Sequence, residues 1–456
     1  METSVTLEHG IQLTHAYPFN RRTEKVSLRK ASGRVLATDL ASKVDDPRFD
    51  NSAMDGWAVR VEDCTQKDTR LRIVGTSQPG GETPPPVSSG EACRIMTGAP
   101  MPLGADAIVM IEDSEEEEGT VRVLGKARPN FIRRKGENLI EGHIALHTGM
   151  QMGPAEISLA ATMGHGELEV VSRPRIAVIS TGDELVQPGL SLTEGEIYES
   201  NSFGLASMIE KMGGEAVRFD SVHDNLEGLR ESFDSAAESC DAILTSGGVS
   251  MGQWDLVRRL MEEEGEPVFW KIKLRPGGPP LFGTWNGVPL FGLPGNPVSS
   301  HVVFIALVAP WISHCMGADP ELGPKLADQV RVKLADPMKG APGKLCMRRI
   351  KIEAGEDGLI ASVHTHQGSG NIHSMVAHNG LTLLPPDTDA EAGDTIDALW
   401  CGLALSSACP TASPRWRSAR SARAPRTPAP ARSTSSKSPW PRPLERDCRS
   451  PSPRAT

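Results

Sequence analysis

The strongest constraint on the fold is a regular alternation of strand-like and helical segments between Arg175 and Gly317. Short apolar runs, typical of buried strands, alternate with segments whose apolar residues recur at helical spacing. The runs are Ile176–Ser180, Val217–Asp220, Ala242–Ser246 and Pro289–Leu293, and the helical segments are Ser202–Met212, Leu226–Ala236, Trp254–Glu264 and the residues from Val298. This order predicts a doubly wound, mostly parallel sheet covered by helices.

The remainder of the chain predicts further domains, because 456 residues exceed what one core usually organises. The α/β domain spans 171–318. Residues 44–139 carry short strands between Gly and Pro turns and predict a β-rich domain. Residues 1–43 and 140–170 are partly helical and predict one discontinuous linker or dimerisation domain, and 319–400 predict a β-barrel-like domain. The predicted fold class is therefore multidomain α/β plus β.

Residues 401–456 are rich in Arg, Pro and Ser and lack apolar periodicity, so they predict a disordered tail. From 402 onward the tail holds ten arginines and one lysine against two acids, a net charge of +9. Since the whole chain carries −10, residues 1–401 carry −19. The tail is either an Arg-rich interaction arm or a functionless product of a reading-frame change. We favour the second interpretation, because no periodic element resumes after Trp400.

Composition and charge also bear on location and partners. The acidic body argues against nucleic-acid binding. The N-terminus has no basic region followed by an apolar run, and the apolar stretch Val302–Ile312 is too short to span a bilayer. The eight cysteines include no C-x-x-C pair, so neither a zinc site nor a disulfide framework is indicated. We expect a cytoplasmic protein without membrane contacts.

Polar and glycine-rich segments follow the predicted parallel strands, at the sheet edge where α/β proteins bind ligands. Glycines, hydroxyls and a helix start favour phosphate, whereas the carboxylates of Glu184, Asp224 and Asp255 would repel it unless Mg²⁺ lay between them. Each motif alone is more often a turn or a helix cap, and the combination carries the prediction. The candidate substrate-binding residues of these loops are Thr181, Gly182, Asp183, Ser246, Gly247, Gly248, Ser250, Gly252, Pro294, Gly295, Asn296, Pro297 and Ser299.

Three basic residues alternate in W-K-I-K-L-R-P-G-G-P-P, namely Lys271, Lys273 and Arg275. On a strand, a period of two places all three on one face. One interpretation is a solvated edge strand, which lysines commonly protect from pairing. In an acidic body beside a phosphate site, we favour an anion-binding row.

The stretch D-N-S-A-M-D-G-W-A-V-R, from Asp50 to Arg60, matches neither a regular helix nor a regular strand. Asp55 precedes a glycine between Met54 and Trp57. Either Asp55 forms the turn, or the turn presents Asp55 to a site.

Taken together, several motifs resemble the molybdopterin molybdenumtransferases, a family that includes the E domain of gephyrin. They are S-A-M-D-G, R-I-M-T-G-A-P-M-P-L-G-A-D, S-T-G-D-E-L, S-G-G-V-S-M-G-Q-W-D and G-L-P-G-N-P-V-S. They occur in the family's order across residues 5–398, and the combination is specific although no single motif is.

The resemblance implies a four-domain homodimer that binds adenylylated molybdopterin and molybdate. It implies Mg²⁺-dependent cleavage of the phosphoanhydride, release of AMP and insertion of molybdenum into the pterin dithiolene. Asp55, Glu184, Asp224 and Asp255 match the family's acids, and Asp55 is implied to face the α/β domain of the other subunit. The family match adds Thr97 and Gly98 to the substrate-binding residues, and it implies that the basic row meets phosphate or molybdate. The adenylyltransferase that acts upstream and apo-molybdoenzymes are implied partners.

The chain departs from the family pattern at three places. Asn138 stands where R-R-x-G-E-D often has Asp, so the charge there is lost. Gly278 occupies a commonly basic position, and Arg275 replaces the usual Lys. The final β domain ends near Trp400, where a further closing strand is expected.

Three other functions remain open at this stage. A binding scaffold of the same fold would have no need of four acids, although Asn138 fits it. A molybdopterin adenylyltransferase, or a nucleotide-related hydrolase, would need only the α/β domain. Molybdate and tungstate share one shape and charge, so the residues favour neither.

Overall fold

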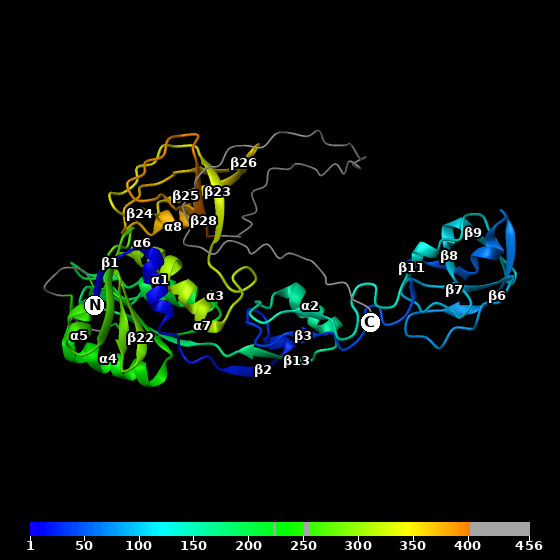
Figure 1. Cartoon of the computed structure of the whole chain (residues 1–456), viewed down its shortest axis with the longest axis horizontal. Helices are drawn as coiled ribbons and strands as arrows, with labels where there is room; N and C mark the ends of the chain where they lie inside the picture. The colour runs from blue at the N-terminus through cyan, green and yellow to red at the C-terminus, as the bar shows by residue number, and fades with distance from the viewer. Residues whose placement is uncertain (222–224, 250–254, 402–456) are drawn as a thin grey trace, which may run out of the picture. The chain divides into compact units, whose positions relative to one another are not determined.

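The computed structural model of the chain describes residues 1–221, 225–249 and 255–401 (Figure 1). The chain divides into two units. The first unit combines Met1–Arg22 with the chain from Val171 onward, and the second is Thr23–Val170. The predictions for the tail from 402 onward lie outside the described residues.

The first unit contains the predicted α/β sheet. Within the described residues the seven strands follow the order β1-β19-β21-β22-β18-β14-β17, and every neighbouring pair is parallel except those made by β21. The doubly wound, mostly parallel sheet is therefore confirmed. The strands are β1 (Glu2–Val5), β14 (Arg175–Ser180), β17 (Glu215–Arg218), β18 (Ala242–Ser246), β19 (Glu266–Ile272), β21 (Leu281–Trp285) and β22 (Val288–Leu293).

Amphipathic helices connect these strands, as the apolar spacing predicted. One group, α4 and α5, packs its apolar side chains with those of β14, β18, β21 and β22 in one core. The other helices pack on one another: α3 contacts α6, and α1 contacts both η5 and α7. The bounds are α1 (Leu7–His15), α3 (Asn201–Lys211), α4 (Leu226–Ser239), α5 (Leu256–Glu263), α6 (Pro297–Val303), η5 (Phe304–Val308) and α7 (Ala309–Met316).

The segments α6, η5 and α7 form one continuous apolar helix. It spans Pro297–Met316, and by length and composition its 20 residues would suffice to cross a membrane. The length argument from Val302–Ile312 was therefore wrong, because the helix extends beyond that run at both ends. In the structure 78% of this stretch is buried inside the protein, as in the core helix of a globular domain.

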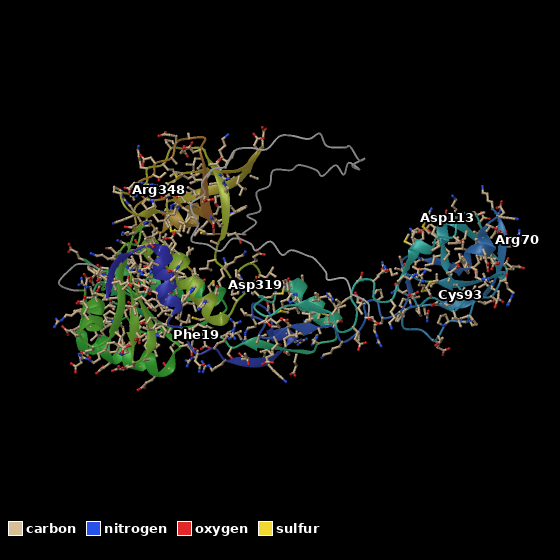
Figure 2. The ribbon with its side chains drawn as sticks, viewed as in Figure 1. Phe19, Arg70, Cys93, Asp113, Asp319 and Arg348 are labelled. Atoms are coloured by element: carbon tan, nitrogen blue, oxygen red, sulfur yellow. The ribbon has the colours of Figure 1, made fainter. Side chains whose placement is uncertain are left out.

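The N-terminal segment belongs to the α/β unit, which corrects the assignment of residues 1–22 to the discontinuous domain. Strand β1 pairs in parallel with β19, matching Glu2 with Phe269 and Val5 with Ile272. Phe19, labelled in Figure 2, packs edge-on against Trp311 at 5.5 Å between ring centroids. The sequence pattern missed this strand because it is short, lies at the sheet edge and pairs with a distant segment.

The segment is also fastened by two stacked imidazoles. His15 ends α1 and lies parallel to His314 of α7, with ring centroids 3.9 Å apart. The pKa of His15 is lowered to about 4, first because its ring is buried and second because His314 is adjacent. The fold therefore holds His15 neutral.

We expect the substitution His15→Phe to reduce the loss of stability on acidification. Because the pKa of His15 is lower in the fold than in the unfolded chain, protons bind the unfolded chain preferentially as pH falls from about 6.5 to about 4. In the wild type this effect should lower the free energy of unfolding across that window by on the order of 1–2 kcal/mol, and the variant should lack this loss. Melting at pH about 7 and about 5 tests this. An identical pH dependence in wild type and variant would contradict it.

The second unit has separate cores. Residues 26–40 and 139–170 share one hydrophobic core built around Leu36, Met152 and Val170. Two further cores lie on the β-rich part of this unit, one around Trp57 and one around Ile95. The core around Leu36 is formed by β2 (Thr23–Ser27), β3 (Leu40–Ala41), β12 (Ile144–Leu146), α2 (Pro154–Thr162) and β13 (Glu167–Val171).

The β-rich part of the second unit is a six-stranded sheet in the order β8-β5-β7-β6-β10-β9. Its described strands are β5 (Gly56–Val59), β6 (Thr69–Ser77), β7 (Glu91–Ile95), β8 (Ala107–Met110), β9 (Ser114–Glu117) and β10 (Thr120–Val123). Trp57 is 1% exposed and donates its indole N–H to Ser114 Oγ at 2.9 Å.

The C-terminal described residues form a closed barrel. Strand β28 pairs with both β23 and β27, which closes the ring β23-β26-β25-β27-β28. The expectation that a closing strand is missing was therefore wrong, because β28 itself supplies it. The strands are β23 (Asp328–Leu334), β25 (Arg349–Gly355), β26 (Gly358–Ser362), β27 (Gly380–Thr382) and β28 (Thr395–Trp400).

Candidate functional site

A cleft of about 670 Å³ opens at the carboxyl ends of β14, β18 and β22, a size typical of small-molecule sites. The chain passes from β14 to β17 on one side and then returns past β14 to β18 on the other side, so the strand order reverses between β14 and β18. Such a reversal point opens a crevice between the loops that follow the two strands. The predicted residues that line it are Thr181, Gly182, Glu184, Ser246, Gly247, Gly248, Asp255, Pro294, Gly295, Asn296, Pro297 and Ser299.

Other predicted residues lie elsewhere. Asp183, Lys271, Lys273 and Arg275 are not among the described residues that line the cleft. Asp224, Ser250 and Gly252 lie outside the described residues. Asp55, Thr97 and Gly98 belong to the second unit.

The floor of the cleft depends on close backbone packing between two loops. Thr181 N donates to Ser246 O at 3.1 Å, and Gly247 N donates to Leu293 O at 3.0 Å. Gly247 has a φ of +104°, and a Cβ there would lie 2.8 Å from both Thr181 O and Thr181 Oγ1. Only glycine satisfies both constraints without displacing Thr181.

We expect Gly247→Ala to destabilise the protein by about 1–3 kcal/mol, because the methyl group and the left-handed backbone both oppose the native loop. Gly295→Ala is the matched control for stability. Its Cβ would meet only Gly247 Cα, at an ordinary 3.6 Å. Thermal melts of the two variants test this, and equal melting temperatures would contradict the packing argument.

Asn201, which the sequence analysis did not single out, joins two of the loops. Its Nδ2 donates to Ser246 Oγ at 2.8 Å and to Gly295 O at 2.7 Å. Asn201 Oδ1 and Thr181 Oγ1 are buried and have no hydrogen-bond partner among the described residues. Buried polar atoms normally have partners, so two such atoms lining one cleft indicate a place for a polar ligand.

Glu199 also lines the cleft, yet its carboxylate is engaged by the protein itself. It is 2% exposed and accepts hydrogen bonds from Ser180 Oγ at 2.9 Å, Ser202 N at 2.8 Å and Ser202 Oγ at 2.6 Å. Arg218 Nη2 lies 3.7 Å from it. Glu199 thus fixes the start of α3 rather than offering a ligand site. Its position after an irregular Gly- and Pro-rich loop carried no sequence signal.

The acids that remain in the lining are Glu184 and Asp255. Asp255 occupies the N-cap position of α5. The described residues contain no group of three His, Cys, Asp or Glu side chains placed to hold a metal. Mg²⁺ usually takes one or two carboxylates and completes its shell with substrate phosphates and water, so it does not require a group of three.

The basic row is only partly as predicted. Lys273 and Arg275 are exposed while the intervening Leu274 is buried, as alternation requires. Lys271 has a φ of +71°, and its Nζ lies 3.8 Å from the Trp270 ring centroid, so it does not continue the alternation. None of the three basic residues lines the cleft, but Pro279, four residues beyond Arg275 in the sequence, does.

In the second unit the S-A-M-D-G turn presents Asp55. A Cβ at Gly56 would overlap Val109 O of β8, so the glycine is required by strand approach. Asp55 is exposed, and its Oδ1 accepts a hydrogen bond from Thr97 N at 2.7 Å. Gly98 N donates to Ser52 O at 2.8 Å. The structure therefore brings the predicted Asp55, Thr97 and Gly98 together, with the acid on the surface.

Asn138, the departure from the family pattern, contacts a carboxylate directly. Its Nδ2 donates to Asp46 Oδ2 at 3.0 Å. An acid at this position would face Asp46 with like charge, so asparagine suits this local structure.

We expect Asn138→Asp to destabilise the second unit by about 1 kcal/mol at neutral pH through repulsion from Asp46. The effect should disappear below pH about 4, where the carboxyl groups protonate. Asn130→Asp, at another exposed position, adds the same charge and serves as control. Chemical denaturation at both pH values tests this. Equal losses in the two variants would show that Asp46 is not the cause.

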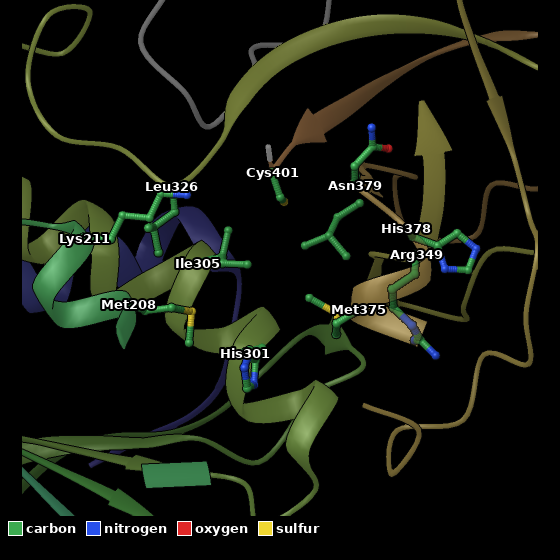
Figure 3. Close-up of a pocket in the computed structure, with 12 residues that line it drawn as sticks. Met208, Lys211, His301, Ile305, Leu326, Arg349, Met375, His378, Asn379 and Cys401 are labelled. Atoms are coloured by element: carbon green, nitrogen blue, oxygen red, sulfur yellow. The ribbon is translucent and has the colours of Figure 1, made fainter. Parts of the chain in front are cut away.

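A second pocket, of about 210 Å³, lies between helices α3 and η5 and the barrel (Figure 3). Apolar side chains including Met208, Ile305 and Met375 line it, and no acid is among the described lining residues. Arg349 contributes to its wall, but its guanidinium donates to Ser374 Oγ at 3.0 Å and Gly368 O at 3.1 Å. This pocket lacks the carboxylates and glycine loops of the cleft and is the poorer phosphate site.

Comparison with known families matches three consecutive parts of the chain. Residues 4–164 match "MoeA N-terminal region (domain I and II)". Residues 177–314 match "Probable molybdopterin binding domain", and 331–400 match "MoeA C-terminal region (domain IV)".

Individual proteins are similar over most of their length. A Haemophilus influenzae protein named molybdopterin molybdenumtransferase is 36% identical over 383 residues, covering 83% of this chain and 94% of that protein. Molybdopterin molybdenumtransferase 2 of Mycobacterium tuberculosis is 36% identical over 389 residues, covering 82% and 94%. The crystal structure of the molybdopterin biosynthesis moeA protein from Pyrococcus horikoshii superposes with a TM-score of 0.74 at 27% identity, covering 87% of this chain and 100% of that one.

Proposed function

The chain belongs to the molybdopterin molybdenumtransferase family, and we propose that it inserts molybdenum from molybdate into adenylylated molybdopterin and releases AMP. The observation that carries this proposal is the cleft at the ends of β14, β18 and β22. It combines glycine loops suited to phosphate with two acids, within a domain that matches a molybdopterin-binding profile.

In the proposed mechanism the loops bind and orient the substrate. The Gly247 N–H donates to Leu293 O and the Val298 N–H to Ser369 O, so the proposed donors to phosphate oxygens are the backbone N–H groups of Gly248 and Ser299, which belong to the cleft lining. Asn201 and Thr181, whose Oδ1 and Oγ1 atoms have no hydrogen-bond partner among the described residues, belong to the lining of the same cleft. These groups hold the anhydride between AMP and the pterin phosphate in one orientation, which lowers the entropic cost of its hydrolysis.

Glu184 and Asp255, together with Asp224, are proposed to hold Mg²⁺. When bound, the ion would neutralise phosphate charge and polarise the anhydride. Hydrolysis adds the elements of water across the anhydride bond and gives AMP and the pterin phosphate. The exposed carboxylate of Glu184 also suits orientation of the attacking water by hydrogen bonding.

The remaining parts of the proposal concern assembly. We propose a homodimer in which Asp55 of one subunit reaches the cleft of the other. The exposed Asp55 carboxylate, held through one oxygen by Thr97 N, supports such a role. A cytoplasmic location is proposed, with the upstream adenylyltransferase and apo-molybdoenzymes as partners.

Release of AMP from adenylylated molybdopterin tests the proposal. We expect release to require both molybdate and Mg²⁺ and to fall about a hundredfold in Asp255→Asn, because that change removes charge from the cleft. Asparagine is also a good N-cap residue, so α5 should keep its start. Glu238→Gln removes the same charge from the exposed surface of α4 and should leave the rate unchanged.

Two results would contradict the proposal in different ways. If substrate binds but no AMP forms under any condition, the cleft is a binding site and the scaffold interpretation holds. If Asp255→Asn and Glu238→Gln behave alike, Asp255 has no part in the reaction.

A further inference from the structure

A lysine from the barrel lies beside the basic row of the α/β domain. Strand β20 (Leu274–Arg275) pairs in parallel with β24 (Leu345–Cys346), aligning Leu274 with Leu345. Leu345 N donates to Lys273 O at 2.9 Å, and Met347 N donates to Arg275 O at 2.7 Å. Lys344 therefore stands next to Lys273 across the pair, although 71 positions separate them in the sequence.

The turn that carries Lys344 is held in place. In A-P-G-K, Lys344 N donates to Ala341 O at 3.3 Å, and Asp387 Oδ1 accepts a hydrogen bond from Gly343 N at 2.9 Å. Asp387 N also donates to Ala341 O at 3.2 Å. Because the backbone on both sides of Lys344 is hydrogen-bonded, the side chain leaves the barrel from a defined point.

The amino group of Lys344 reaches the position where Gly278 has no side chain. Its Nζ lies 3.9 Å from the point that a Cβ of Gly278 would occupy. Gly278 follows the basic row and directly precedes Pro279, which lines the cleft. Within the described residues no ion pair is found for Lys273, Arg275 or Lys344 at distances up to 4.0 Å. Three exposed cations that form no ion pair raise the local electrostatic potential in a protein whose body is acidic.

We infer that Lys344 completes an oxyanion-binding edge with Lys273 and Arg275 and supplies the charge that Gly278 lacks. The ligand class is a tetrahedral oxyanion, either molybdate or a phosphate of the pterin nucleotide. This inference rests on the proposed function and adds to it a residue from the barrel. Lys344 is a binding residue, so its removal should weaken affinity and leave the chemical step intact.

Kinetics of AMP release by the full-length protein test the inference. We expect Lys344→Ala to raise KM for one oxyanion substrate about three- to tenfold, the effect of one exposed charge, with kcat changed less than about twofold. KM for molybdate is measured with saturating adenylylated molybdopterin, and KM for adenylylated molybdopterin with saturating molybdate. The substrate whose KM rises identifies the oxyanion. Lys333→Ala, which removes an exposed lysine of β23, is the matched control and should change neither KM.

A second pair of variants tests whether the two positions serve one site. Gly278→Lys in the Lys344→Ala background should restore KM. The new side chain starts beside the position of the Lys344 amino group and returns one positive charge to this edge. Gly278→Ala in the same background adds only the Cβ, which lies 3.3 Å from Leu274 O, and should not restore it. Lys344→Arg should keep KM close to wild type.

The outcomes separate this inference from the proposed function. If Lys273→Ala raises KM while Lys344→Ala does not, the role of Lys344 is refuted and the proposed function stands. If neither variant alters KM while AMP release proceeds, the basic edge has no part in substrate binding. Recovery with Gly278→Ala as well as Gly278→Lys, or with neither, would overturn the claim that Lys344 replaces a side chain at Gly278.

Discussion

The cleft depends on the parallel pairing of β14, β18 and β22. Their register places Ser180 beside Ser246 and Ser246 beside Leu293, so three strands end at the same level. Two further backbone hydrogen bonds continue this alignment into the loops and bring Thr181 against Gly247. Because the pairs are parallel, loops that lie far apart in the sequence converge at one edge. The glycine loops and acids acquire a common site only through this register.

The electrostatic arrangement follows from the same geometry. An acidic protein that binds an anionic substrate must place positive potential locally, since its overall charge opposes binding. Backbone N–H groups of the loops are proposed to provide part of it, and Mg²⁺ held by Glu184 and Asp255 to provide another. Lys273, Arg275 and Lys344 lie at the junction where β20 pairs with β24. The barrel is thereby tied to the edge of the α/β domain by backbone hydrogen bonds.

Sequence reasoning was most accurate where a periodic pattern is long and buried. Strand β18 has the predicted bounds, and α4 buries most of the predicted apolar residues. In α3 the predicted Phe203 is exposed and Leu205 is buried instead. Sequence reasoning failed at edges. Strand β1 has only Val5 buried, so it shows no alternation. Strand β28 closes the barrel through pairings with β23 and β27, and nothing in its own residues identifies those partners. Lys271 left the alternating row because its backbone is left-handed.

The sequence by itself determined the α/β class, the loops that carry the chemistry and most residues of the cleft, because hydrophobic periodicity and glycine positions are local signals. The tertiary structure decided which residues meet. Glu199 has a structural role because Ser180, Ser202 and Arg218 surround its carboxylate. Asn201 belongs to the cleft because its side chain donates hydrogen bonds to two loops. Lys344 reached Gly278 through strand pairing between domains. Such contacts depend on register and domain packing between distant segments, which no local pattern encodes.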